Sequence, residues 1–472
     1  MSQTAQSPLS ARVSSSTAGS VASLLSRELL GWAWLAVGAL GVAGVFAFLL
    51  ALSRVPGMDR APFWPIEFFY KGLVIHVVFS LAIWLLTVFA FLSVRATLEL
   101  AGDDMRGAPL GWIGQAAVLV AFPCLFMPAF LDAARPQLLN YVPIIRHPAY
   151  DLGLFALALG VLAPVARLFA NLPSRLSAPS PLAFAMSAGG FVYCVALLCF
   201  AIAGSLLARR GDLTSSRDLL FWGGGHVMQF VYAALMVTNW SILARLSLGE
   251  NVVDARVFRL AILFIAALAV PAPVFYGLFE PFSDGQHEAF RLLQFGITIP
   301  TFLFAVSLVV RARALRPTSA WPWPDPAFFT LGFSLALFAL GGTMGFLITG
   351  ADTRTPAHYH AVITAVSVSS AGMVLTYGLD ALGRARPSAH ATRILIGLYG
   401  GGQFVASIGM FVAGGYGAAR KTPVGVGSLD AVAAAGMAVH GIASLFTIAG
   451  GVAFIVVAAR ALWRPAPAPA SG

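Results

Sequence analysis

Long apolar runs alternate with short polar stretches along almost the whole chain. Each run is long enough for a helix to cross roughly 30 Å of hydrocarbon. About twelve transmembrane helices are predicted, near residues 31–53, 70–94, 111–131, 150–170, 183–208, 219–246, 256–279, 289–311, 327–349, 357–379, 392–414 and 431–459. The longest polar interruptions are predicted loops around residues 54–69, 135–149, 311–326 and 415–430.

The composition agrees with that pattern. Of the 472 residues, 59% are hydrophobic and only 10% are charged, which excludes a soluble domain of this size. The sequence predicts an all-α, polytopic membrane protein with a single transmembrane domain over residues 31–460. Residues 1–30, rich in Ser, Ala and Thr, are expected to form a disordered cytoplasmic tail, and residues 461–472 a second disordered tail.

The net charge of +10 comes mostly from arginines in the loops. Such a distribution favours contact with membrane lipid and does not argue for nucleic acid. A modest excess of Lys and Arg on the face that carries both ends predicts cytoplasmic termini, in what we expect to be a bacterial inner membrane. The three cysteines lie within apolar runs without a CxxCH spacing, which excludes covalent c-type haem.

Two histidines open the tenth apolar run. His358 and His360 lie at positions i and i+2, so on a helix they project about 200° apart and can face different neighbours. An imidazole is costly inside a membrane, and ionisable groups there usually serve a function. One helix could therefore ligate two metals; the alternative is a pair of histidines satisfied by backbone carbonyls near a helix end.

Further histidines fall at the same end of the predicted bundle. His76 lies in the second span, His226 in the sixth, and His287 in the connection between the seventh and the eighth. In the predicted topology, all of them lie at the outer end of their helices, as His358 and His360 do. The other three histidines are interpreted as loop or interface residues: His147, His390 and His440.

Four short segments carry a resemblance to a known family. They are residues 69–76 (FYKGLVIH), 217–226 (RDLLFWGGGH), 357–360 (AHYH) and 417–421 (GAARK). In these segments and their order, the chain resembles subunit I of the haem-copper oxidase superfamily, which includes cytochrome c oxidases and nitric oxide reductases. The resemblance covers essentially all twelve predicted spans.

The resemblance implies two haems. His76 and His360 would be the axial ligands of a low-spin haem, which needs two imidazoles from opposite faces. His358 would hold a high-spin haem whose other face is open to a small gas. Arg420 and Lys421 would pair with the haem propionates, although ordinary juxtamembrane charge explains them as well.

The second metal is where the chain departs from the family. His226 matches a copper ligand, but Tyr276 and Gly277 stand where the family has two adjacent copper-binding histidines. Copper is therefore not expected. Glu280 and His287 follow closely, and with His226 they would suit non-haem iron. Two alternatives stay open: a solvated acidic loop, and a high-spin haem without a second metal. Tyr276 and Glu280 are the candidate catalytic residues.

Two classes of function follow. The first is a respiratory oxidoreductase that receives electrons from cytochrome c, another redox subunit or quinol. Nitric oxide is favoured as its substrate, because coupling two molecules takes two electrons and needs neither copper nor a redox tyrosine; dioxygen is the next candidate. The second is a non-catalytic, haem-bearing paralogue that binds gas or handles electrons without a copper site. No dedicated channel for proton pumping is visible in the spans.

Overall fold

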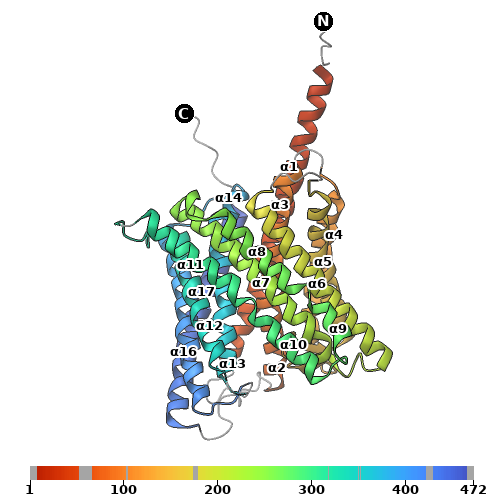
Figure 1. Cartoon of the computed structure of the whole chain (residues 1–472), viewed down its shortest axis with the longest axis vertical. Helices are drawn as coiled ribbons and strands as arrows, with labels where there is room; N and C mark the ends of the chain where they lie inside the picture. Colours follow the sequence, from red (N-terminus) through yellow and green to blue (C-terminus); the bar gives the residue numbers. More distant parts are fainter. Residues whose placement is uncertain are drawn as a thin grey trace.

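The structure is a computed structural model that describes residues 8–52, 66–101, 105–173, 179–316, 318–348, 350, 352–420 and 429–464. For residues 8–25, 51–52 and 66–67 only the backbone is described. Its elements are labelled in Figure 1, where α marks α-helices, η marks 3₁₀- or π-helices, and β marks strands.

The first half of the chain comprises α1 (Pro8–Leu52), α2 (Ile66–Val77), η2 (Val78–Ile83), α3 (Trp84–Ala101), α4 (Ala108–Phe126), η3 (Met127–Phe130), β1 (Arg135–Gln137), β2 (Ile144–Arg146), α5 (Pro148–Ala170), α6 (Pro181–Arg210) and α7 (Arg217–Leu248). The second half comprises η4 (Glu250–Val252), α8 (Ala255–Ala269), η5 (Ala272–Val274), α9 (Phe275–Leu278), α10 (Asp284–Phe295), α11 (Thr298–Leu315), α12 (Pro326–Phe346), α13 (Arg354–Met373), η6 (Val374–Gly378), α14 (Leu379–Ala381), α15 (Ala389–Ile396), η7 (Gly397–Gly401), α16 (Gly402–Gly415) and α17 (Ala431–Trp463).

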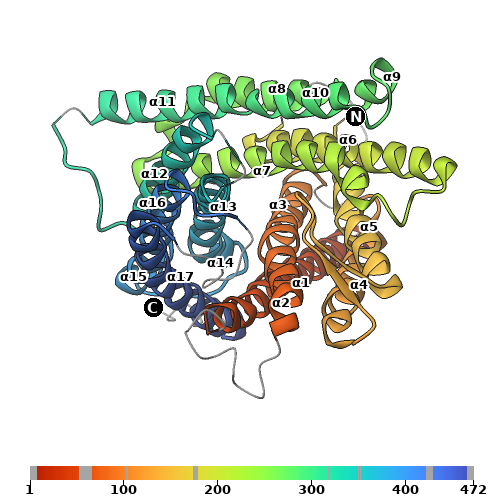
Figure 2. The same ribbon diagram turned by 90° about the horizontal axis from the view of Figure 1, so that it is seen from below.

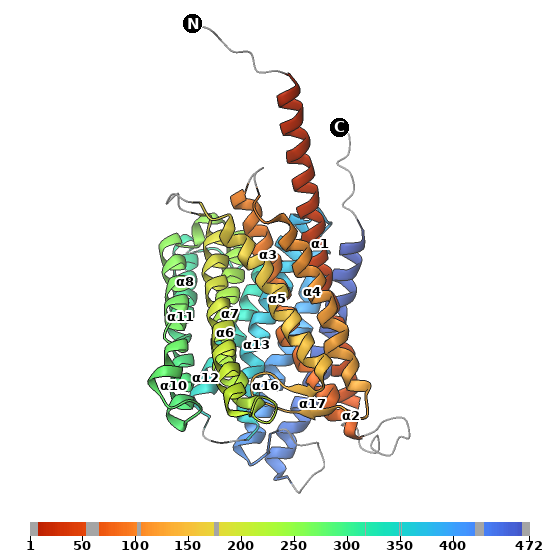
Figure 3. The ribbon, with the colours of Figure 1, turned by 90° about the vertical axis from the view of Figure 1, so that its right-hand side faces the viewer.

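The predicted all-α membrane fold is confirmed. Among the described residues, twelve helical spans are long and apolar enough to cross a bilayer, and each overlaps a predicted one. The helix α1 begins, and α17 ends, at the end of the bundle opposite to the one where α2, α10 and α13 begin (Figure 1, Figure 3). Seen along the bundle, α3, α7 and α13 lie nearer the middle than α4, α11 and α16 (Figure 2).

Local sequence signals set where the helices begin. The Ser180 hydroxyl accepts a hydrogen bond from the Ala183 amide and caps α6, and the Asp254 and Asp325 carboxylates cap α8 and α12 in the same way. Proline occupies the first turn of α5, α6 and α12, where its missing N–H costs nothing. The helices therefore begin where capping groups replace the missing intrahelical hydrogen bonds.

The eighth span is longer than predicted. Residues 284–288 were read as a polar connection, whereas α10 begins at Asp284 and the whole span runs from Asp284 to Leu315. The reason is a helix cap: the Ser283 hydroxyl accepts a hydrogen bond from the Gln286 amide. The helix thus extends beyond the apolar run that hydropathy detects, and His287 is helical instead of lying in a loop.

The three spans that carry His76, His226, and the pair His358 and His360 are the most buried ones. For each span we compare the buried share of an apolar stretch of 18 residues. This share is 78% in Phe68–Ala101, 78% in Arg217–Leu248 and 83% in Arg354–Ala381. In the other nine spans this share lies between 22% and 50%. Because an apolar environment penalises an unsatisfied imidazole, each of these histidines needs a partner inside the bundle.

The predicted disordered tail over residues 1–30 is corrected in part. The helix α1 already begins at Pro8, and Glu28 and Leu29 are buried among the membrane helices. Hydropathy placed the first span too late because it counts Glu28 as a polar residue and does not detect its buried partner. Residues 1–7, like residues 465–472 of the second predicted tail, lie outside the described residues.

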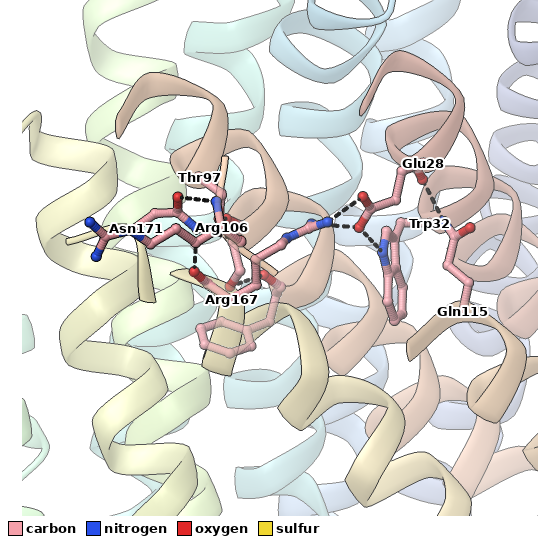
Figure 4. A network of polar contacts seen from close by, with 9 residues as sticks. Glu28, Trp32, Thr97, Arg106, Gln115, Arg167 and Asn171 are labelled. Carbon is pink, nitrogen blue, oxygen red and sulfur yellow. Dashed lines mark hydrogen bonds and ion pairs between the residues drawn. The ribbon is translucent and has the colours of Figure 1, made fainter. Parts of the chain in front are cut away.

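That partner is Arg167 of α5 (Figure 4). Its guanidinium donates two hydrogen bonds to the Glu28 carboxylate, with N–O distances of 2.7 and 2.6 Å. Both side chains are buried: Glu28 is 3% exposed and Arg167 is 0% exposed. The Gln115 side chain of α4 donates a further bond to the Glu28 carbonyl at 2.5 Å. A Cβ atom at Gly111 would lie 2.3 Å from the Glu28 carboxylate, so the glycine makes room for this network.

We predict that Glu28→Gln destabilises the protein strongly, because it leaves the Arg167 guanidinium buried without a counter-charge. The cost of breaking a buried pair in this way is about 3–5 kcal/mol. Thermal unfolding of the detergent-purified protein measures it. The control is Glu250→Gln, which breaks the exposed pair with Arg245 and should cost at most about 1 kcal/mol. Equal destabilisation by the two variants would contradict the structural role of the buried pair.

Candidate functional site

The His76 side chain is held by the neighbouring helix α1. Its Nδ1 atom lies 3.0 Å from the Ala43 carbonyl oxygen, which can only accept, so Nδ1 carries the proton and donates. The ring lone pair then lies on Nε2. The π-helix η2 begins two residues later, and such π-bulges occur frequently at functional sites. The His76 carbonyl accepts a hydrogen bond from the Ser80 hydroxyl at 2.6 Å.

His358 is held in the same way by α12. Its Nδ1 donates to the Gly341 carbonyl oxygen at 2.7 Å, which again puts the lone pair on Nε2. One turn further along α12, Gly345 lies directly against the imidazole: a Cβ atom built there would be 2.8 Å from the His358 Cε1 atom. His360, two residues after His358, has its ring stacked on that of Tyr359.

The start of α13 is tied to the end of α16. The Thr353 amide donates to the Ala418 carbonyl at 3.0 Å, and the Thr353 hydroxyl donates to the Met410 carbonyl at 2.9 Å. Asp352 accepts a hydrogen bond from the Arg354 amide, and the Arg354 guanidinium holds the pKa of the Asp352 carboxyl below its usual range. These bonds join the start of α13, which carries the two histidines, to the segment that ends at Arg420.

A single cavity joins these residues. It has a volume of about 1560 Å³, and His76, His358, His360 and Arg420 all line it. A pocket for one small ligand is roughly 300–1,000 Å³, so this cavity has room for more than one cofactor. Its walls come from spans far apart in sequence, including α1, α2, α7, α12, α13, α16 and α17. Lys421, the second predicted propionate partner, lies outside the described residues.

The cavity and its histidines fit haem. In metal-binding histidines, one ring nitrogen usually donates to a carbonyl or carboxylate and thereby orients the other toward the metal. His76 and His358 both have this arrangement, with backbone carbonyls as acceptors. His76 and His360 come from different helices, α2 and α13, and line the same cavity. The described residues therefore provide the ligand chemistry for haem iron.

The predicted site for a second metal is not assembled. His226 is buried in α7, and its two ring nitrogens are engaged: Nδ1 donates to the Trp222 carbonyl at 2.7 Å, and Nε2 lies 2.7 Å from the Tyr141 hydroxyl. The Glu280 side chain is exposed. The His287 ring packs against the ring of Trp222. Among the residues that the structure describes, no three His, Cys, Asp or Glu side chains are grouped so that they could hold a metal.

The physical reason lies in the fold of residues 271–295. The chain leaves α9 at Leu278, exposes Glu280, and enters α10, whose Phe290 packs between the rings of His226 and Tyr276. The described residues therefore do not bring His226, Glu280 and His287 together as a group that could hold iron, and the predicted iron site gains no support from them. The donors present do not fit a second metal.

Tyr276 is not a cavity residue either. It is 7% exposed, its ring packs on Phe290, and its hydroxyl lies so close to Gly223 that a Cβ atom there would be 2.3 Å away. It is not among the described residues that line the cavity, and Glu280 and His287 are also absent from that lining. The structure thus gives no support to Tyr276 or Glu280 as catalytic groups.

Comparison with known proteins identifies the family. A family model described as "Cytochrome C and Quinol oxidase polypeptide I" matches residues 29–453. The chain belongs to this family. The resemblance to subunit I of the haem-copper oxidases, inferred from four short segments, is thus confirmed.

Individual relatives agree with the assignment. An uncharacterised protein of Aquifex aeolicus is 28% identical over 352 residues, which cover 73% of this chain and 83% of that protein. An uncharacterised protein of Rickettsia prowazekii is 22% identical, with 91% of this chain and 95% of the relative covered. A haem-copper terminal oxidase, solved as a dimer by cryo-electron microscopy, matches the fold with a TM-score of 0.75 at 17% identity, over 94% of this chain and 85% of its own.

Two cavity residues were missed by the sequence analysis. Tyr141 lies in the connection between β1 and β2, which pair antiparallel, and it is bonded to His226. Burial raises the pKa of the Tyr141 hydroxyl above its usual value, and a hydrogen bond with Gln229 opposes that shift. His440, interpreted as a loop or interface residue, is buried in α17 and lines the cavity. No motif marks either of them, because each depends on contacts between segments that are distant in the sequence.

The tight contact at Gly345 gives a test of the cavity. Gly345→Ala should displace the His358 imidazole and weaken haem binding there about fivefold or more, since overpacking costs about 1–3 kcal/mol. Carbon monoxide difference spectra of the reduced protein, normalised to protein content, measure the loss. The control is Gly441→Ala in α17, a helical glycine that does not line the cavity and where a Cβ atom would meet nothing within 4 Å, so binding should be unchanged. Unchanged binding in both variants would rule out the placement of haem at His358.

Proposed function

We propose that this chain is a dihaem membrane oxidoreductase that passes electrons from a low-spin haem to a high-spin haem, where a small gas is reduced. The observation that carries the proposal is the cavity of about 1560 Å³ in which His76, His358 and His360 meet. The backbone hydrogen bonds of His76 and His358 give both rings the tautomer of an Nε2 metal ligand.

Each residue has a specific role in this proposal. His76 and His360 hold the low-spin haem from α2 and α13, and His358 holds the high-spin haem. Arg420, which lines the cavity, pairs with propionates and at the same time donates a hydrogen bond to the Asn140 side chain at 3.2 Å. When bound, the haems supply electron transfer and a binding site for gas.

Nitric oxide is the favoured substrate and dioxygen the next candidate. Reduction of two nitric oxide molecules takes two electrons and does not need a copper centre, which the described residues do not provide. Electrons would come from cytochrome c, another redox subunit or quinol. We place the protein in a bacterial inner membrane with both termini in the cytoplasm. The even number of spans among the described residues and the modest excess of Lys and Arg on the face that carries both ends support this orientation.

A second function is favoured by one observation, the engagement of both His226 ring nitrogens within the protein. A chain without a second-metal site is also consistent with a haem protein that binds gas or handles electrons without turnover. The two functions share the haem histidines and differ in whether gas is consumed.

Substitution of single histidines should separate the two haems. His76→Ala should remove the low-spin bands from the optical spectrum and leave carbon monoxide binding intact, whereas His358→Ala should abolish carbon monoxide binding and spare the low-spin bands. The control is His390→Ala in α15, an exposed histidine that should alter neither. A spectrum unaffected by His76→Ala, or full carbon monoxide binding after His358→Ala, would refute the corresponding haem assignment.

Turnover distinguishes enzyme from binding protein. The purified protein, supplied with an artificial electron donor, should consume nitric oxide faster than dioxygen when both are followed with gas electrodes. His358→Ala should abolish this consumption. Faster dioxygen use would reverse the choice of substrate. Stoichiometric carbon monoxide binding without consumption of either gas would support the non-catalytic alternative.

A further inference from the structure

The hydrogen-bond pattern at His226 leaves it no lone pair for a metal. The Trp222 carbonyl can only accept, so the His226 Nδ1 atom carries the proton and donates to it. Nε2 is then the acceptor, and the Tyr141 hydroxyl at 2.7 Å donates to it. The rings of Tyr141 and His226 pack with their centroids 4.4 Å apart. A metal at Nε2 would have to displace a buried hydrogen bond.

The connection between the paired strands β1 and β2 holds Tyr141 in position. Residues 138–143 connect β1 and β2, and Asn140 anchors this connection: its amide N–H donates to the Asp218 carboxylate of α7 at 3.2 Å, and its side-chain oxygen accepts from Arg420 at 3.2 Å. At Gly225 of α7, a Cβ atom would lie 2.6 Å from the Tyr141 Cβ atom. Only glycine allows this approach, so α7 has a gap that the tyrosine fills.

Tyr141 also faces the proposed haem cavity. It lines the cavity of about 1560 Å³ together with His358, and so does Gln229, which lowers the pKa of the Tyr141 hydroxyl against the effect of burial. Tyr141, His226 and the Trp222 carbonyl thus form one connected chain of hydrogen bonds. A buried network in which the members are satisfied is rigid and specifies one arrangement.

We propose that Tyr141 stands in place of a second metal: it caps His226, so that the gas-binding cavity contains haem iron as its only metal, and its phenol oxygen forms a polar wall of that cavity. The proposal rests on the proposed function, since it assumes that the haem at His358 binds gas. It assigns His226 a positioning role, as the partner that holds the Tyr141 phenol in place, and assigns it no role as a ligand.

Metal analysis tests the first half of the proposal. The purified full chain should contain iron equal to its haem content, without copper or further iron, and His226→Asn should leave the metal-to-haem ratio unchanged. At cryogenic temperature, infrared spectra after photolysis of the carbon monoxide adduct should show loss of the iron-carbonyl band without a new carbonyl band on another metal. One extra metal per chain that is lost in His226→Asn, or such a new band, would overturn the proposal.

Tyrosine substitution tests the second half. Tyr141→Phe should shift the iron-carbonyl stretching band, because it removes the phenol oxygen from the cavity wall. Its matched control is Tyr193→Phe, another cavity tyrosine, whose hydroxyl donates to the Ala158 carbonyl at 2.9 Å; its band should stay in place. An unshifted band in Tyr141→Phe, or equal shifts in both variants, would refute the role of Tyr141. Absence of haem from the wild-type protein would instead refute the proposed function.

Discussion

The spacing of two imidazoles on α13 is the constraint on which the proposed centre depends. His358 and His360 are two residues apart and so cannot serve the same metal from one helical face. His358 is fixed by the Gly341 carbonyl of α12, and the second imidazole for the other haem must come from elsewhere in the bundle. His76 lines the same cavity from α2 and is fixed by the Ala43 carbonyl of α1. In an apolar interior these bonds also remove the penalty for an unsatisfied N–H group.

The two ends of the bundle use buried polarity differently. At the end where the long helix α1 enters the bundle, Glu28 and Arg167 form a closed ion pair with fully buried side chains, and its effect is to fix α1 against α5. At the opposite end, the histidines and Arg420 line an open cavity instead. The buried ion pair therefore stabilises helix packing at one end of the bundle. At the other end, in our proposal, the histidines and Arg420 bind cofactors.

The sequence predicted the fold better than the centre. Hydropathy located all twelve spans because hydrocarbon thickness imposes a length that a single sequence reveals. The histidines at positions 76, 358 and 360 could be assigned from short motifs, and the structure places all three on one cavity. The described residues do not assemble the iron site predicted from His226, Glu280 and His287, because suitable ligand chemistry at one end of the bundle does not ensure that the side chains meet, and Glu280 is exposed. Tyr141 could not be found, since its contact with His226 joins a hairpin to a helix 85 residues away.

The central claim is that one chain holds two haems in different ligand environments, both of them through α13. Electron paramagnetic resonance of the oxidised, purified protein, quantified against total haem, tests it most directly. The account predicts equal amounts of a low-spin signal typical of two axial imidazoles and a high-spin signal typical of one, each at one per chain. A single haem per chain, or two haems that are both low-spin, would contradict it.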